Sequence, residues 1–228
     1  MKKKSVLIIT LTMYIICMSF SASSAGTDYT AKPCDDDNDF TVSDISGGVT
    51  FVDGRECEMT KEEAQQAYIE ELLYENRTEI FEKPKISLKA IVSTKINTKE
   101  TLKGGNRRIT HVYNNMTSSD IVQEVSGSET WSEELSAGAD SDKIIEAIKL
   151  NFDITVGHSA TKSVKTTVTI KPGEKFYVTF TPNLVKVTGT HIVSLHGGMV
   201  TNKTFTAVFH KLVNGKADGN VYYITKKI

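Results

Sequence analysis

Two stretches in the middle of the chain alternate between apolar and polar positions. In residues 117–137 five apolar residues, Ile121, Val125, Trp131, Leu135 and Ala137, fall on odd positions, and in residues 152–170 the apolar residues fall on even positions. The positions between them are rich in Ser, Thr and charged residues. A period of two is typical of a β-strand with two different faces. We therefore expect two strands of about 18–20 residues, far longer than the usual five or six.

The segment between these stretches is predicted less sharply. Residues 140–150 contain Ile144, Ile145 and Ile148 at a spacing that suits a short helix capped by Ser141 or Asp142. The same segment also suits the apolar tip of a long hairpin. The pattern leaves both alternatives open.

Elsewhere the chain predicts one N-terminal helix and a body of strands. Thr60-Lys61-Glu62-Glu63 is a capping box, and apolar residues at helical spacing follow it to about Glu75, before Pro84. Val49–Val52 reads as a short strand that turns at Asp53-Gly54, and turn signals such as Pro182-Asn183 recur from residue 85 onward. We expect a mainly β, elongated antiparallel protein.

The N-terminus predicts export. Three lysines precede an apolar run from Val6 to Phe20, and small residues follow at 23–25, which is typical of a secretory signal peptide over residues 1–25. We expect a disulfide-containing region with the helix over residues 26–84 and a β domain over residues 85–228. Cys34 and Cys57 are the only cysteines beyond the signal, and in an oxidising compartment we expect them to form a disulfide.

Composition and motifs argue against several kinds of activity. The whole chain has a formal charge of −1, and loss of three lysines with the signal lowers it to −4, so nucleic acid is not an expected partner. The chain has no G-x-S-x-G, H-E-x-x-H or phosphate-loop motif, so we expect no enzyme and no cofactor. Its five histidines are scattered, and the acidic run at residues 35–39 lacks the spacing of a calcium loop, so no metal site is expected.

Two physical interpretations of the alternating strands compete. In one, both strands belong to an extended sandwich whose Ser/Thr face contacts water, and the protein is a secreted binding or adhesion module. In the other, an amphipathic hairpin over about residues 119–170 leaves the body and joins other copies in a membrane barrel, which satisfies every backbone group inside lipid. Trp131, the only Trp, is either a sheet-packing aromatic or an anchor at the membrane interface.

The chain here resembles the pore-forming module of aerolysin-type toxins, in particular the epsilon-toxin and mosquitocidal-toxin branch. The resemblance lies in Asn114-Asn115-Met116-Thr117, the two Ser/Thr-alternating strands, and Ile170-Lys171-Pro172-Gly173. It implies a secreted toxin that binds an unknown receptor on a target-cell membrane, forms a homo-oligomer and inserts a hairpin. The predicted insertion residues share an apolar side chain on the two strands or the tip: Ile121, Val125, Trp131, Leu135, Ile144, Ile145, Ile148, Phe152, Ile154 and Val156.

Overall fold

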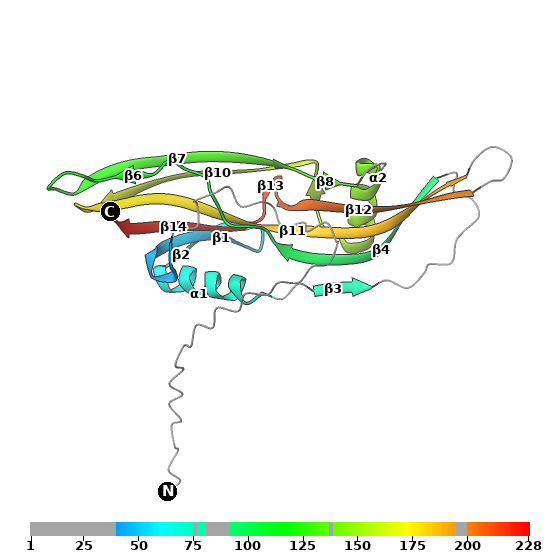
Figure 1. Ribbon diagram of the computed structural model, residues 1–228, viewed down its shortest axis with the longest axis horizontal. Helices are drawn as coiled ribbons and strands as arrows, with labels where there is room; N and C mark the ends of the chain where they lie inside the picture. The colour runs from blue at the N-terminus through cyan, green and yellow to red at the C-terminus, as the bar shows by residue number, and fades with distance from the viewer. Residues whose placement is uncertain (1–39, 75–76, 81–91, 137–138, 195–199) are drawn as a thin grey trace, which may run out of the picture.

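The computed structural model shows an elongated, mainly β protein with antiparallel strands and, among the described residues, two α-helices (Figure 1). It describes residues 40–74, 77–80, 92–136, 139–194 and 200–228. The first elements are η1 (Val42–Asp44), β1 (Ile45–Val52), β2 (Arg55–Met59), α1 (Lys61–Leu72), β3 (Arg77–Ile80), β4 (Val92–Lys103), β5 (Arg107–Arg108) and β6 (Tyr113–Asn114). The later elements are β7 (Ile121–Ser132), β8 (Glu134–Leu135), α2 (Ser141–Phe152), β9 (Val156–Gly157), β10 (Ser159–Ile170), β11 (Glu174–Ser194), β12 (Val200–Val213), β13 (Lys216–Ala217) and β14 (Gly219–Lys227).

The 21-residue strand β11 organises the main sheet, which we call the long sheet. Its first half pairs with β14 on one edge and with β5 and β6 on the other. Its second half pairs with β12 and β4. Pro182, where the sequence predicted a turn, lies within β11 at the point where the partners change: Pro182 is opposite Gly219 of β14, and Leu184 is opposite His210 of β12. A proline, which has no N–H to donate, fits where one ladder ends and another begins.

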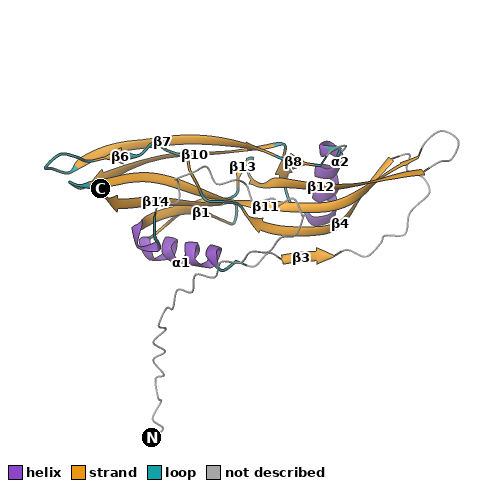
Figure 2. Ribbon diagram, in the orientation of Figure 1, coloured by secondary structure: helices purple, strands orange, loops and turns teal. Residues whose placement is uncertain are grey.

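Strands β7 and β10 form a separate two-stranded sheet, which we call the hairpin. They pair over twelve residues each, from Ile121 opposite Ile170 to Ser132 opposite Ser159. The hairpin lies over the half of the long sheet that contains β14 (Figure 2). The predicted length of 18–20 residues per strand is therefore too long, because the chain leaves the ladder after Ser132 and rejoins it at Ser159.

Residues 133–158, which we call the connecting segment, hold the second helix. The structure selects the helical alternative for residues 140–150, and the predicted apolar tip is wrong for this state. Asp140 is the N-cap and accepts a hydrogen bond from the Lys143 amide, while Asp153 ends the helix with a left-handed φ of 52°. Ile144 and Ile148 are fully buried. α2 is therefore a packed helix and not an exposed apolar loop.

The N-terminal helix is confirmed as α1, which begins after Thr60 with both hydrogen bonds of the predicted capping box. Ala64 and Tyr68 of α1 pack against Tyr222 on the face of the long sheet opposite the hairpin. The predicted turn at Asp53-Gly54 is also confirmed, since it joins β1 to β2 with φ of 48° and 78°.

The N-terminal 39 residues and several other sequence predictions lie outside the described residues. These include the predicted signal peptide and Cys34. Cys57 carries a free thiol, so no disulfide is present among the residues that the structure describes. The predicted Cys34–Cys57 bond is therefore not part of this structure.

Close packing of the hairpin on the long sheet requires glycine at position 127. A Cβ atom at Gly127 would overlap the carbonyl oxygen of Ile109 and crowd the Thr110 side chain. We expect Gly127→Ala to lower the free energy of unfolding by about 1–3 kcal/mol, measured from urea midpoints. The matched control is Gly105→Ala, because a Cβ there meets no atom within 4 Å. Equal effects of the two substitutions would contradict this packing.

Candidate functional site

The inner face of the hairpin is held to the long sheet by side chains. Val125, Trp131, Ala160 and Ile170 are buried against a cluster on β11 and β14 that includes Phe176, Val178, Phe180 and Val221. The centre of the Trp131 ring lies 5.3 Å from the centre of the Phe180 ring and 5.7 Å from the centre of the His210 ring. In this structure Trp131 is therefore a sheet-packing aromatic.

Lys162 is a buried cation on the same inner face, with 2% of its side chain exposed. Its Nζ donates to Glu56 Oε1 of β2 at 3.0 Å and lies 4.7 Å from the centre of the Phe51 ring. Burial by itself raises the pKa of Glu56, but the hydrogen bond and charge of Lys162, aided by Lys216, bring this pKa below its usual value. The ion pair therefore ties β10 to the N-terminal hairpin β1–β2 and compensates a charge that the core would otherwise exclude.

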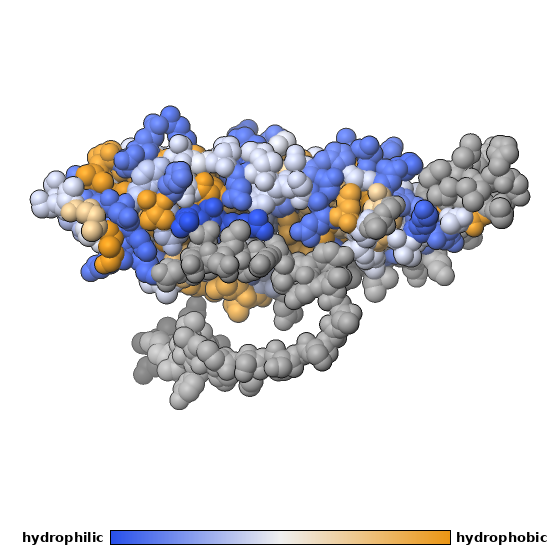
Figure 3. Space-filling model, turned by 45° about the horizontal axis from the view of Figure 1, so that its top comes forward, coloured by the Kyte–Doolittle hydropathy of each residue, from blue (hydrophilic) through white to orange (hydrophobic). Residues whose placement is uncertain are grey.

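The outer face of the hairpin is polar and exposed. Ser128 and Ser163 share a hydrogen bond of 2.9 Å across the two strands, and Thr130 and Thr161 share one of 2.8 Å. The top of the molecule, which carries this face, is mostly blue and white in Figure 3. The predicted Ser/Thr face is therefore present and contacts water.

A histidine joins the end of the hairpin to the start of α2. His158 contacts Glu133 Oε1 through Nδ1 at 3.0 Å and Asp142 Oδ1 through Nε2 at 2.9 Å. Ser141 Oγ lies 2.6 Å from the same Nδ1. The hydrogen bonds to Glu133 and Asp142 raise the pKa of His158, so their stabilising contribution is complete at low pH and is lost as the pH rises through this raised pKa.

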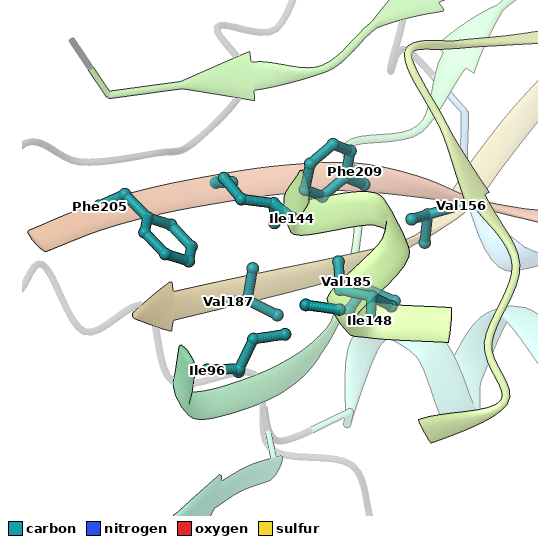
Figure 4. Packing of buried hydrophobic residues seen from close by; sticks show 10 residues of the cluster. Ile96, Ile144, Ile148, Val156, Val185, Val187, Phe205 and Phe209 are labelled. Carbon is teal, nitrogen blue, oxygen red and sulfur yellow. The ribbon is translucent and has the colours of Figure 1, made fainter. Parts of the chain in front are cut away.

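Helix α2 is docked on β4, β11 and β12. Ile144 and Ile148 pack with Val185, Val187 and Phe209 (Figure 4). Burial of these two isoleucines stabilises the docked helix by about 1.5–3 kcal/mol each.

A second histidine fixes the N-terminus of the docked helix. The Asp140 amide donates to His191 Nε2 at 3.2 Å, and His191 Nδ1 lies 3.0 Å from Thr94 Oγ1. Burial lowers the pKa of His191, which favours the neutral ring that this accepted hydrogen bond requires.

A cleft of about 280 Å³ opens where the hairpin ends and the connecting segment begins. Trp131, Arg107, Leu184 and His210 contribute to its lining. The buried atoms Trp131 Nε1 and His210 Nδ1 have no hydrogen-bond partner among the described residues. Packing at this junction therefore leaves open space beside two buried polar atoms that lack a partner.

The predicted insertion residues do not form one continuous hairpin. Ile121, Val125 and Trp131 lie on the inner face of β7, and Leu135 is part of β8. Four others, Ile144, Ile145, Ile148 and Phe152, lie on α2, while Ile154 and Val156 follow it. Whether any of them enters a membrane stays a prediction.

Lys162 is the important residue that sequence reasoning missed. It occupies an even position among the apolar residues of β10, and its break in the alternation was the available signal. Its partner Glu56 is distant in sequence, and no pattern in the chain identifies it.

The described residues contain no group of three or more potential metal ligands. Within the same residues, neither α1 nor α2 has the length and apolar character needed to cross a membrane.

The buried ion pair predicts an asymmetric mutational response. Glu56→Gln removes the compensating charge while Lys162 stays buried, and we expect it to lower the free energy of unfolding by about 1–3 kcal/mol. Lys162→Met keeps the length and removes the charge, so we expect a neutral or stabilising effect.

Chemical denaturation of both variants measures the difference. Lys165→Met is the control, because its ion pair with Glu124 is exposed and is expected to contribute less than about 0.5 kcal/mol. A Lys162→Met variant less stable than Glu56→Gln would contradict the asymmetry.

The lowered pKa of His210 predicts that the folded protein loses stability at acid pH. Burial, together with the nearby Arg107 charge, lowers the pKa of His210 to about 4, from the usual value of 6.5. Between these values the unfolded chain binds the proton and the folded protein does not, so stability falls as the pH decreases through this window. We expect the His210 contribution to fall by about 1–2 kcal/mol between pH 7 and pH 4.5, after allowance for partial exposure.

Urea midpoints at both pH values test this contribution. His210→Phe keeps a ring against Trp131, and we expect it to remove this part of the pH dependence. The control is His111→Gln, at an exposed position. An unchanged pH dependence in His210→Phe would rule out His210 as its source.

Comparison with known proteins gives a structural likeness but no match to a family. No family model matches the chain, and no curated protein matches it. Among solved structures, the chain is similar to the crystal structure of the parasporin-2 Bacillus thuringiensis toxin that recognizes cancer cells, with 12% sequence identity and a TM-score of 0.22. The match covers 81% of this chain and 84% of that chain. A likeness of this degree carries no argument about what the chain does.

Proposed function

We propose that this protein is a secreted, non-enzymatic pore-forming protein. It oligomerises on a target-cell membrane and inserts an amphipathic segment within residues 119–170. The observation that carries this proposal is the hydrogen bonding of the hairpin. Among the described strands, β7 and β10 pair only with each other, so these two strands can leave the long sheet without breaking a ladder of their own. The rest of the segment is held by short ladders, because β8 and β9 each pair with β12 over two residues.

Three further features support detachment. The hairpin is held by side-chain packing and by the Lys162–Glu56 pair. Because these contacts are between side chains, the hairpin can separate from the long sheet without unfolding β11. The cleft beside Trp131 leaves the interface incompletely packed at one end. The two faces of the hairpin differ in polarity, as a strand between lipid and a water-filled pore requires.

The alternative is a secreted binding module that never inserts. The burial of Lys162 and the solvated Ser/Thr face favour it, because both are explained by a stable sandwich. The two functions differ in a measurable way: only the pore-forming protein releases the contents of vesicles.

Locking the connecting segment to the body tests insertion. Leu135 of β8 and Ala207 of β12 are directly opposite, next to the hydrogen-bonded pair of Ser136 and Thr206. Such a non-hydrogen-bonded pair places its Cα atoms about 4.5 Å apart, which suits a disulfide. We therefore expect Leu135→Cys/Ala207→Cys, with Cys57→Ser, to abolish dye release when oxidised and to recover it on reduction.

The assay uses dye-loaded vesicles of phosphatidylcholine and cholesterol and vesicles of total target-cell membrane extract, each with and without limited trypsin treatment. The protein without the new cysteines is expected to release dye and to form an oligomer on the vesicles, and each single-cysteine variant serves as a control. Release by the oxidised double variant would contradict insertion, and binding without release by the unmodified protein would establish the binding module.

A further inference from the structure

The cleft beside Trp131 lies where β11 changes its partners. The ladder with β14 ends at Pro182, and the ladder with β12 begins at Leu184. At the same level, β4 ends at Lys103 and β5 begins at Arg107. Residues 104–106 between them belong to no strand. The cleft is therefore a gap that the pairing of the long sheet leaves open.

Two glycines keep this gap free of side chains. Gly104 approaches Pro182 so closely that a Cβ atom would overlap Pro182 Cγ, while a Cβ atom at Gly105 would meet nothing within 4 Å. Both glycines belong to the lining of the cleft. Its volume of about 280 Å³ lies just below the range of about 300–1,000 Å³ that is usual for ligand sites. The space therefore suits a small organic molecule.

Arg107 supplies a positive charge to the cleft. Its side chain is half-buried and has no ion-pair partner among the described residues. Glu134, the acidic residue of the lining, is exposed, so water and salt screen its charge more strongly. The His210 ring is neutral at pH 7, because burial and, after it, the Arg107 charge lower its pKa to about 4. The inside of the cleft is therefore net positive.

The lining also offers a hydrogen-bond donor and an apolar wall. Trp131 Nε1 can only donate, and it is buried with no acceptor among the described residues. An acceptor in the cleft can recover the cost of this missing hydrogen bond, either directly or through one water molecule. Pro182, Leu184 and Val208 contribute carbon surface to the same lining. These features together select a ligand with one negatively charged end and an apolar body.

We propose that the cleft binds a small organic anion, with its carboxylate on the Arg107 guanidinium and its carbon body against Pro182, Leu184 and Val208. A guanidinium holds a carboxylate by two parallel hydrogen bonds. A bound anion contacts the hairpin through Trp131 and the long sheet through β5, β11 and β12, so it ties the two together. This site does not depend on the proposed pore-forming function.

The fluorescence of Trp131 tests the site without a label, because Trp131 is the only Trp of the chain. The full chain is titrated at pH 7 and constant ionic strength with hexanoate, with the neutral hexanamide of the same shape, and with the cationic hexylamine. We expect hexanoate to change the emission saturably with a Kd of about 0.1–10 mM, which a ligand of this size can reach. Hexanamide and hexylamine are expected to bind at least about tenfold more weakly, because they cannot form the charge-assisted hydrogen bonds to Arg107.

A matched pair of variants identifies the cation. Arg107→Gln removes the charge from the cleft, and we expect it to raise the Kd for hexanoate at least about tenfold. The control is Arg108→Gln, because Arg108 is the exposed neighbour and does not belong to the lining. It is expected to leave the Kd unchanged.

The urea midpoint gives a second readout, because a ligand that binds only the folded protein stabilises it by mass action. We expect hexanoate, but not hexanamide, to raise the midpoint of the unmodified protein and of Arg108→Gln. Equal affinity for hexanoate and hexanamide, or no saturable response to hexanoate, overturns the anion site whatever the dye-release assay shows. Equal weakening by the two arginine variants overturns it as well. The comparison of the three ligands uses the unmodified protein and so does not require that Arg107→Gln folds.

Discussion

The pairing of β11 along both of its edges is the constraint on which the rest of the structure depends. β14, β12, β4, β5 and β6 occupy these edges along most of its length. The hairpin therefore cannot pair with β11 and lies on the face of the long sheet instead. Side-chain packing on a face separates more easily than a ladder, because no backbone group loses its partner. This difference gives the protein one element that can move while its frame stays folded.

The hairpin and α2 are held down by different kinds of contact. The hairpin is held by an apolar cluster and by the buried Lys162–Glu56 pair. Separating the two charges of this pair costs electrostatic free energy. α2 relies on Ile144 and Ile148 and on a hydrogen bond from its N-cap residue to His191. His158 lies between these two regions and contacts residues of both. The pKa of His158 is raised and that of His191 is lowered. The contacts that each histidine makes therefore respond differently to pH.

The N-terminal part contributes directly to the candidate site. Phe51 and Glu56 of the β1–β2 hairpin surround the Lys162 ammonium, so residues far from the alternating strands decide how a charge is tolerated inside the sandwich. α1 has no such role, because it packs on the opposite face of the long sheet. The three layers at this end therefore have separate tasks: α1 covers one face, the long sheet provides the frame, and the hairpin is retained on the other face.

The alternation of residues 121–132 and 159–170 was sufficient to predict two strands with an apolar inner face and a Ser/Thr outer face, because each residue's face in a strand depends only on its position. The capping box at Thr60 likewise determined the start of α1, since all its hydrogen bonds are local. Alternation could not determine where the ladder ends. Residues 133–158 carry both a period of two and a helical period, and the pocket formed by Val185, Val187 and Phe209 decides in favour of the helix. The sequence also could not predict the Lys162–Glu56 pair or the continuation of β11 beyond Pro182. Both depend on segments that are distant in sequence and meet only in the tertiary structure.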